Sequence, residues 1–300
     1  MEAAKRGREF LRRAPTWVPL AALLLLGALI VARSSSAGSS RPPRFKHVIV
    51  IVFENHEAGQ VFGDPAARTF RQLSERYATL ANYDAVAHPS LPNYLALVSG
   101  STFGIGKDCT YCVFDGPNLA DTLAAHSLTW KNYVERLPRD PARVHRPAVK
   151  ARIPFLYFQD VLSSRRRMHD IVPLETFGDD LHAHRLPSFS LVIPDLCHDM
   201  HDCSIGTGDH WLASFMRPLL GSDELQHSVV FITFDEGVRP DDRGGGGQVP
   251  AIVAGPLVDP GGVTTDLLDH YSLLRTIEDA WGLPPLGLSA SAEPITGIWR

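Results

Sequence analysis

Four short runs rich in valine, isoleucine and phenylalanine constrain the fold of this 300-residue chain more than any other feature. They cover residues 47–53, 188–193, 229–234 and 249–254. Continuous apolar runs of this length are typical of strands buried on both faces, as in parallel sheets covered by helices. Segments with helical apolar spacing alternate with them: residues 66–80, 91–99, 118–126, 209–220 and 270–281. The alternation predicts an α/β fold, a sandwich with a mostly parallel central sheet and helices on both faces.

Polar side chains follow three of these runs at the point where each run ends. Glu54 and Asn55 follow the first, Asp235 and Glu236 follow the third, and residues 194–202 bring aspartates and histidines after the second. The carboxyl ends of strands line the ligand site in open α/β sheets. One acid at a strand end commonly caps a helix or a turn. Carboxylates crowded from three strand ends need a compensating cation, and oxygen ligands with histidine suit a divalent metal.

A serine lies at the start of another helical pattern. A short strand is expected near residues 83–87, and the sequence His-Pro-Ser-Leu-Pro-Asn-Tyr at 88–94 follows it. Ser90 is at least an N-cap, since Pro92 falls in the first turn. A helix N-terminus also binds phosphate, and a hydroxyl beside a metal there can attack phosphorus. We therefore expect Ser90 to be the nucleophile and Asn93 to donate to a phosphate oxygen.

Further motifs occur in order along the chain: Ser99-Gly-Ser101, Asp199-Met-His-Asp202, Gly208-Asp-His-Trp-Leu212, Asp235-Glu-Gly237, Ala254-Gly-Pro256 and the segment 269–278. Together with Glu54-Asn55 and residues 88–94, they resemble the bacterial phosphoesterase family. That family includes phospholipase C enzymes and secreted acid phosphatases, and it belongs to the alkaline-phosphatase-like superfamily. The resemblance runs from about residue 46 to residue 298. It is closest to secreted actinobacterial acid phosphatases that act on phosphatidylinositol 3-phosphate and other phosphomonoesters.

The resemblance implies roles for individual residues. The metal ligands of the family match Glu54, Asn55, Asp235 and Glu236, and its Ser or Thr nucleophile matches Ser90. Asn93 matches an asparagine that holds a phosphate oxygen. His201 and His270 match positions that bind phosphate or a second metal, or that protonate the leaving group. The expected cofactor is thus a divalent metal cation of unspecified identity.

One position departs from the family pattern. Many relatives carry a His-x-Pro-Phe segment, and this chain has Arg152 where that histidine would stand. A guanidinium can bind phosphate but cannot act as an acid near neutral pH. We therefore expect Arg152 to bind substrate rather than to transfer a proton.

The N-terminal segment has the order of a secretory signal. An arginine-rich opening leads into the uncharged run 17–32, and small residues follow at 34–40. Residues 1–37 are therefore expected to be a signal peptide or, if uncleaved, an N-terminal anchor through residues 17–32. Residues 44–300 contain no internal repeat or long linker and should form a single catalytic domain. The protein is expected to be secreted or otherwise extracytoplasmic.

Composition and charge exclude several functional classes. With 44% apolar and 21% charged residues, the chain is globular rather than disordered, collagen-like or built from many membrane spans. Residues 41–300 carry a net charge of −8, so nothing indicates nucleic acid as a partner.

The four cysteines fall into two close pairs, Cys109 with Cys112 and Cys197 with Cys203. Local pairing into two loop-closing disulfides is the simplest arrangement, and it suits an oxidising compartment. A zinc site built from both pairs is the alternative, although five residues separate the second pair.

These observations predict a phosphomonoesterase that works through a phosphoserine, with a phosphoinositide lipid among its expected substrates. The resemblance favours a monoesterase, because long relatives with phospholipase C activity carry extra C-terminal domains. A phosphodiesterase of the phospholipase C type is the first alternative. A non-catalytic binding protein on the same scaffold is the second.

Overall fold

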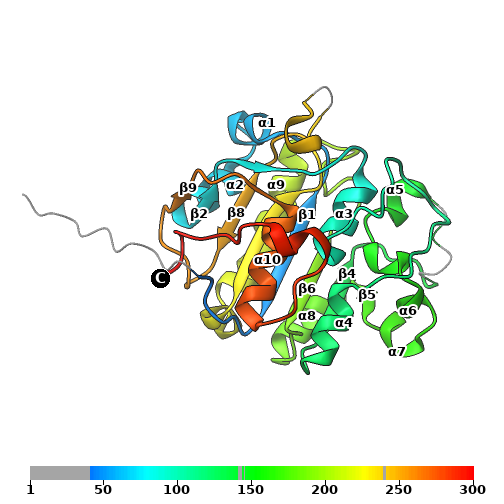
Figure 1. Cartoon of the computed structure of the whole chain (residues 1–300). Helices are drawn as coiled ribbons and strands as arrows, with labels where there is room; N and C mark the ends of the chain where they lie inside the picture. The colour runs from blue at the N-terminus through cyan, green and yellow to red at the C-terminus, as the bar shows by residue number, and fades with distance from the viewer. Residues whose placement is uncertain (1–40, 141–143, 145, 239–240) are drawn as a thin grey trace, which may run out of the picture. The chain divides into compact units, whose positions relative to one another are not determined.

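The computed structural model describes residues 41–140, 144, 146–238 and 241–300. Within these residues the main sheet has the strand order β5-β4-β6-β1-β7-β8-β2-β9 (Figure 1). Its strands are β1 (Val48–Phe53), β2 (Ala78–Leu80), β4 (Trp130–Val134), β5 (Ile171–Pro173), β6 (Phe189–Ile193), β7 (Val229–Phe234), β8 (Ala251–Ala254) and β9 (Val263–Thr264). A separate parallel pair joins β3 (Tyr83–Asp84) to β10 (Leu268–Asp269).

The centre of the main sheet is parallel, as expected. β5, β4, β6, β1 and β7 pair in parallel, whereas β8 runs antiparallel to both β7 and β2. Every residue of β1 and of β7 is buried. Strands buried on both faces need helices on both sides.

The helices are α1 (Ala58–Gly63), α2 (Arg68–Arg76), α3 (Ser90–Ser99), α4 (Leu119–Ala125), α5 (Pro147–Lys150), α6 (Gln159–Leu162), α7 (Arg165–Met168), α8 (Glu175–His182), α9 (Ile205–Leu220) and α10 (His270–Trp281). Helix α2 packs on α9, and α3 packs on α10. Phe53 contacts Phe70 of α2 and Trp211 of α9, whereas the next residue, Glu54, bonds Tyr94 of α3. Because successive side chains of a strand point to opposite faces, the two helix pairs cover opposite faces of the sheet.

Two of the differences between the expected and the observed elements have a direct physical cause. The helix expected over 66–80 ends at Arg76, because Tyr77 leaves the helical conformation and residues 78–80 form β2 between β8 and β9. Strand β4 was not expected, since Lys131 and Asn132 interrupt its apolar pattern. Asn132 is nevertheless fully buried and donates to the Leu191 carbonyl of β6 at 3.2 Å.

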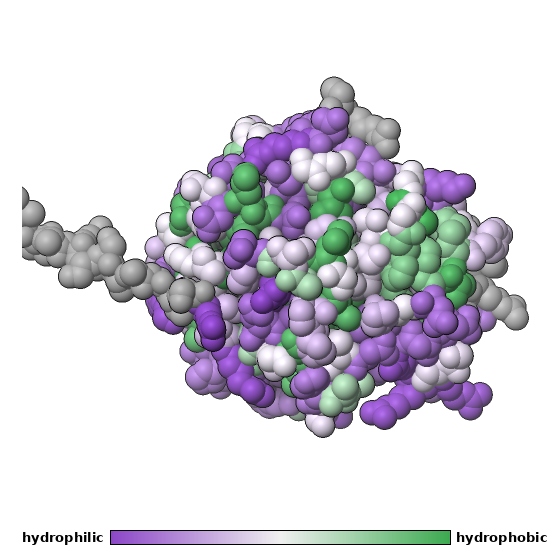
Figure 2. Space-filling model, in the orientation of Figure 1, coloured by the Kyte–Doolittle hydropathy of each residue, from purple (hydrophilic) through white to green (hydrophobic). Residues whose placement is uncertain are grey.

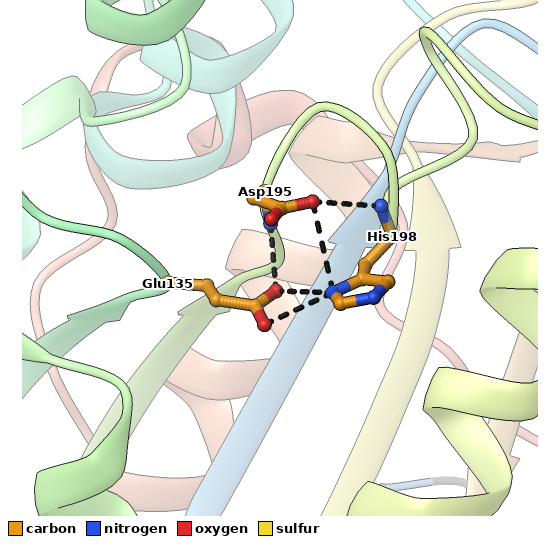
Figure 3. A group of neighbouring side chains, drawn as sticks. All are labelled: Glu135, Asp195 and His198. Atoms are coloured by element: carbon orange, nitrogen blue, oxygen red, sulfur yellow. Dashed lines mark hydrogen bonds and ion pairs between the residues drawn. The ribbon is translucent and has the colours of Figure 1, made fainter.

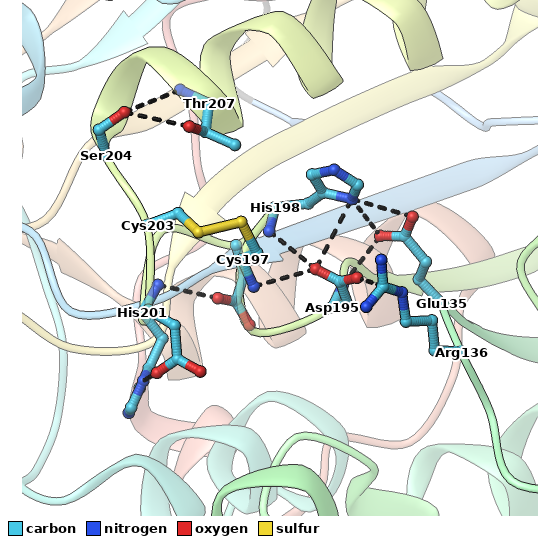
Figure 4. Close-up of a disulfide and its surroundings, with 11 residues drawn as sticks. Glu135, Arg136, Asp195, Cys197, His198, His201, Cys203, Ser204 and Thr207 are labelled. Carbon is cyan, nitrogen blue, oxygen red and sulfur yellow. Dashed lines mark hydrogen bonds and ion pairs between the residues drawn. A yellow bond between two sulfur atoms is a disulfide. The ribbon is translucent and has the colours of Figure 1, made fainter.

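The disulfides pair locally, as expected. Cys109 bonds Cys112 with an S–S distance of 2.06 Å, and Cys197 bonds Cys203 at 2.03 Å. The second bond closes the loop that follows β6 (Figure 4). Among the described residues, no helix is long and apolar enough to cross a membrane. The expected signal or anchor, residues 1–37, lies outside the described residues.

The visible surface is mostly hydrophilic (Figure 2). Apolar residues gather on the side of the molecule where Figure 1 labels α5.

The four adjacent parallel strands β4, β6, β1 and β7 all end at the same edge of the sheet. Acidic residues follow their ends: Glu135, Asp195, Glu54 and Asp235. This edge therefore positions the candidate site.

Candidate functional site

The ends of β1 and β7 bring the expected metal ligands together. Glu54 and Asp235 are buried, and the backbone N–H groups of Asn55 and Glu236 both donate to Oδ1 of Asp235, at 3.3 and 2.7 Å. Asn55 turns the chain with a φ of 55°, a left-handed conformation that asparagine tolerates better than most residues. Oδ2 of Asp235 and Oδ1 of Asn55 are buried without a hydrogen-bond partner among the described residues.

The electrostatics of this cluster call for a cation. Burial raises the pKa of Glu54 well above its ordinary value, the nearby charge of Asp235 adds to that, and the charge of Arg152 opposes it. Burial likewise raises the pKa of Asp235, with a further contribution from Glu236. Buried polar atoms normally have partners, so the two unpartnered oxygens indicate a missing ligand. Carboxylate and amide oxygens are the donors that hard divalent cations prefer, so these residues fit such an ion.

Ser90 opens α3 with its hydroxyl directed at this cluster. The N-cap of α3 is Pro89, so the Ser90 hydroxyl is not used to cap the helix. Its Oγ instead donates to Oε1 of Glu236 at 3.0 Å. A carboxylate within hydrogen-bond distance of a serine can accept its proton during nucleophilic attack.

Sequence reasoning missed two residues around Ser90. His88 hydrogen-bonds Oε2 of Glu236 through Nδ1, and its Nε2 bonds the Asp241 carbonyl at 2.9 Å. Since a carbonyl only accepts, Nε2 of His88 carries a proton. Asp108 accepts from the Leu91 backbone N–H at 3.0 Å. An acidic side chain thus already lies at the N-terminus of α3, where the helix dipole favours negative charge. The motif contained His88, but no pattern in the sequence placed Asp108.

Asn93 was expected to donate to a phosphate oxygen, but in the structure its side chain bonds backbone groups. Its Oδ1 accepts from the backbone N–H groups of Val86 and Ala87, at 2.9 and 3.1 Å. Its Nδ2 donates to the carbonyls of Ala87 and Pro89, at 2.8 and 3.3 Å. The amide group is thus occupied by the backbone that leads to Ser90. In this arrangement Asn93 fixes the loop rather than offering a free donor to phosphate.

His270 is also engaged on both ring nitrogens. Nε2 donates to the Asp235 carbonyl at 2.7 Å, and Nδ1 lies 3.0 Å from the Tyr83 hydroxyl. Burial lowers the pKa of His270 to about 4, so the ring is neutral at ordinary pH. Because Nε2 holds the proton, Nδ1 accepts from the hydroxyl of Tyr83. His270 therefore supports the backbone of Asp235 and has no proton free for a leaving group.

His201 and Arg152 both bond Asp199, and Arg152 also lies near Glu54. The His201 backbone N–H donates to Asp199 at 2.9 Å, while its side chain is partly exposed and pairs with Asp202. Arg152 is buried and donates to Oδ2 of Asp199 at 2.5 Å, and its Nε lies 3.7 Å from Oε1 of Glu54. Burial raises the pKa of Asp199 to about 6, and Arg152 opposes that shift. Arg152 thus neutralises two carboxylates at the edge of the site.

A second cluster lies at the ends of β4 and β6 (Figure 3). Ligand atoms of Glu135, Asp195 and His198 all lie within 4.8 Å of one another, a group that could hold a metal ion. These atoms also satisfy one another, because Nδ1 of His198 bonds both carboxylate oxygens of Glu135. Oδ1 of Asp195 accepts two backbone N–H groups, and Oδ2 pairs with Arg136 at 2.7 Å (Figure 4). These contacts form an ion-pair network within the chain.

Comparisons with known proteins identify relatives of this chain. The sequence profile of the phosphoesterase family matches residues 64–284. The chain is 33% identical over 285 residues to a phosphatidylinositol-3-phosphatase of Mycobacterium tuberculosis, covering 93% of this chain and 91% of that protein. It is 30% identical over 257 residues to a probable acid phosphatase of Kluyveromyces lactis, covering 81% of this chain and 60% of that protein.

The fold has solved relatives as well. A protein of the alkaline phosphatase superfamily from Vibrio parahaemolyticus superposes with a TM-score of 0.61 at 12% identity, covering 86% of this chain and 72% of that one. The chain therefore shares the α/β fold of that protein, the architecture that the sequence predicted. On these matches the chain belongs to the phosphoesterase family, whose members hydrolyse phosphoric ester bonds.

Proposed function

We propose that this protein is a secreted, metal-dependent acid phosphatase that cleaves phosphate monoesters through a phosphoserine at Ser90. The observation that carries the proposal is the contact of the Ser90 hydroxyl with Glu236 at 3.0 Å, beside unpartnered oxygens of Asn55 and Asp235. The printed names of the relatives, a phosphatidylinositol-3-phosphatase and acid phosphatases, support monoesters and a phosphoinositide as substrates.

The divalent cation would be held by oxygens of Glu54, Asn55, Asp235 and Glu236. When bound, such a cation neutralises negative charge on the phosphate and favours the ionised form of a nearby hydroxyl. The remaining chemistry belongs to residues of the chain. Phosphoryl transfer depends mainly on positioning and charge, so a rigid site on strand ends suits it.

In the first step Ser90 attacks phosphorus in line with the leaving alcohol. The Oγ–P bond forms, the bond between phosphorus and the alcohol oxygen breaks, and the Ser90 proton passes to Oε1 of Glu236. His88 holds the other oxygen of Glu236 and so keeps Oε1 turned toward the serine. The departing alkoxide takes a proton from solvent or from His201, whose side chain is partly exposed.

In the second step water attacks the phosphoserine. The water oxygen bonds to phosphorus as the Oγ–P bond breaks, and Glu236 returns its proton to Oγ. One proton of the water stays on the phosphate and the other passes to solvent. Arg152 offsets the charges of Glu54 and Asp199, so the edge of the site accepts an anionic substrate more readily. Asn93 and His270 fix the backbone on either side, at the serine loop and at Asp235.

Secretion is part of the proposal. Two disulfides in one chain fit an oxidising compartment outside the cytoplasm, and the leader expected over residues 1–37 would direct the chain there. Detection of the mature chain in culture medium, with Ala37 or a neighbouring residue at the cleavage point, would support this. Retention of residues 17–32 in a membrane fraction would favour the anchor instead.

The test is phosphate release by residues 38–300 from p-nitrophenyl phosphate and phosphatidylinositol 3-phosphate, with and without EDTA. The matched variants are Ser90→Ala and Ser214→Ala, the second being an exposed serine of α9. We expect metal-dependent release that Ser90→Ala abolishes and Ser214→Ala retains. Faster turnover of p-nitrophenylphosphocholine than of p-nitrophenyl phosphate would instead indicate a diesterase. A folded protein without activity or bound metal would indicate a binding protein.

A further inference from the structure

A cavity of about 460 Å³ lies beside the candidate site. Its walls come from the segment after β4, from α5 and from the loop after β6, and they include Arg136, Arg146, Val149, Arg152 and Leu196. The cavity therefore lies at the carboxyl edge of the sheet, where ligands bind in folds of this type. A volume of this size is within the range of small-molecule sites.

Arg152 connects the cavity to the cluster around Glu54. The arginine forms part of the cavity wall, and its Nε lies 3.7 Å from Oε1 of Glu54. Asp199, its partner at 2.5 Å, belongs to the same disulfide-closed loop as Asp202, another wall residue. Arg152 thus lies between the cavity and the carboxylate of Glu54. A substrate whose phosphate lies at Ser90 can extend its alcohol part toward the cavity.

The acidic residues of the wall already have partners. Glu135 bonds His198, Asp195 pairs with Arg136 at 2.7 Å, and Asp202 pairs with His201 at 2.7 Å. Figure 4 shows Arg136 lying beside both Asp195 and Glu135. The negative charges of the wall are therefore compensated within the protein.

The positive charges of the wall are not all compensated. Arg152 is held by Asp199 and the Pro194 carbonyl. The side chain of Arg146, the exposed N-cap residue of α5, has no hydrogen bond or ion pair with any part of the chain that the structure describes. A guanidinium without a partner at the wall of a cavity is suited to bind a phosphate group by two parallel hydrogen bonds.

We propose that this cavity binds the alcohol part of the substrate, and that Arg146 selects alcohols that carry a second phosphate group. The inference rests on the proposed phosphatase function and narrows its substrate class. Arg136 contributes from the same wall, while Val149 and Leu196 provide apolar contacts for the carbon skeleton. Two sources share this chemistry: the phosphodiester of a phosphoinositide head group and a soluble sugar or polyol bisphosphate.

The test compares substrates that differ only in the second phosphate. The kcat/KM for myo-inositol 1,3-bisphosphate is divided by that for myo-inositol 3-phosphate, in the wild type, Arg146→Ala and Arg139→Ala. Arg139 is an exposed arginine of the same segment that does not line the cavity. A charged hydrogen bond is worth about 1.5–3 kcal/mol, so we expect Arg146→Ala to lower this ratio about 10- to 100-fold. Arg139→Ala should leave the ratio unchanged.

A purely structural role of Arg146 would lower both kcat/KM values equally, and an unchanged ratio in Arg146→Ala would overturn the inference. Short-chain phosphatidylinositol 3-phosphate distinguishes the two sources. A larger loss for this lipid than for the bisphosphate assigns the second anion to a lipid phosphodiester, and the reverse assigns it to a soluble compound.

Calorimetric binding of myo-inositol 1,3-bisphosphate to the Ser90→Ala protein separates this inference from the proposed function. Wild-type protein that turns over no monoester refutes the function. If Arg146→Ala then still weakens binding about tenfold or more in the Ser90→Ala background, the cavity inference stands. Equal binding with and without Arg146 would refute it.

Discussion

Removing the divalent cation should destabilise this protein, and the loss should be larger at alkaline than at acidic pH. Without a cation, burial raises the pKa of Glu54 and of Asp235, and repulsion adds to it, from Asp235 on Glu54 and from Glu236 on Asp235. A carboxyl group whose pKa is raised in the folded protein stabilises the fold while it is protonated. This stabilisation is present below the pKa that the group has in the unfolded chain, and it is lost as the pH rises through the pKa of the folded state. A bound cation favours the ionised carboxylates, so the loaded protein should not lose this stability. Cation binding must also displace protons at low pH, which weakens it there.

The size of the effect follows from linkage. A cation present at about 100 times its Kd adds about 2.7 kcal/mol to the free energy of unfolding. For a domain of about this length, 1 kcal/mol shifts Tm by about 2–4 °C. We therefore expect the cation to raise Tm by about 5–11 °C near pH 8. Near pH 5 the cation should add less to the free energy of unfolding, by about 1.4 kcal/mol for each pH unit over which one proton must be displaced. The increase in Tm should be smaller accordingly.

The assay is thermal unfolding of EDTA-treated protein with Mg²⁺, Ca²⁺, Mn²⁺ or Zn²⁺ added singly at both pH values. Asp235→Asn removes the charge of the buried carboxyl that has the unpartnered oxygen, and it keeps the shape of the side chain. Without metal this variant should be at least as stable as the wild type near pH 8, and it should respond little to any cation. Asp242→Asn, at an exposed acid of the nearby loop, should behave like the wild type.

Two results would refute this reasoning. The first is a Tm that no cation changes at either pH, since the cluster would then need no ion. The second is an Asp235→Asn protein that responds to the cation as strongly as the wild type, since the ion would then bind elsewhere. The cluster of Glu135, Asp195 and His198 would be the next place to examine.

Two further predictions concern His88, beside the candidate site, and Glu278, in the interior of α10. His88→Ala leaves one oxygen of Glu236 without its partner and should weaken cation affinity, measured by calorimetric titration, about 10- to 100-fold, whereas the exposed His169→Ala should not. A His88→Ala protein with wild-type affinity would contradict the positioning role. Burial raises the pKa of Glu278 to about 7. Relative to Glu278→Gln, the wild type should lose up to about 3 kcal/mol of unfolding free energy as the pH rises from 4.5 to about 7. Urea titrations at several pH values measure this, and parallel curves for the two proteins would disprove it.

The part of the fold that the sequence predicted is the part buried on both faces. β1 is apolar throughout, and β6 and β7 each contain a single polar residue, Ser190 and Thr233, so their pattern identified them without a partner. β4 lies in the same parallel sheet, but the side-chain amide of Asn132 donates to a carbonyl of β6, a contact between residues 59 positions apart in the sequence. The antiparallel direction of β8 likewise depends on tertiary pairing that no local pattern contains.

The candidate site could be predicted for residues that directly follow strands. It could not be predicted for residues whose role depends on a hydrogen-bond partner far away in the sequence. Strand order places Glu54, Asn55 and Asp235 at one sheet edge, and the structure brings them into contact. The partners of Asn93 and His270 are backbone groups, which a sequence motif does not identify. The contact of His88 with Glu236 joins residues 148 positions apart. Such partnerships arise only when the chain has folded.

The central claim is a covalent phosphoserine, and one measurement tests it directly. The metal-loaded protein is mixed briefly with p-nitrophenyl phosphate and quenched in acid, and its peptides are examined by mass spectrometry. We predict one added phosphoryl group on the peptide that contains Ser90, and none in Ser90→Ala. An active protein that carries no phosphate, or carries it on another residue, would contradict the proposed mechanism.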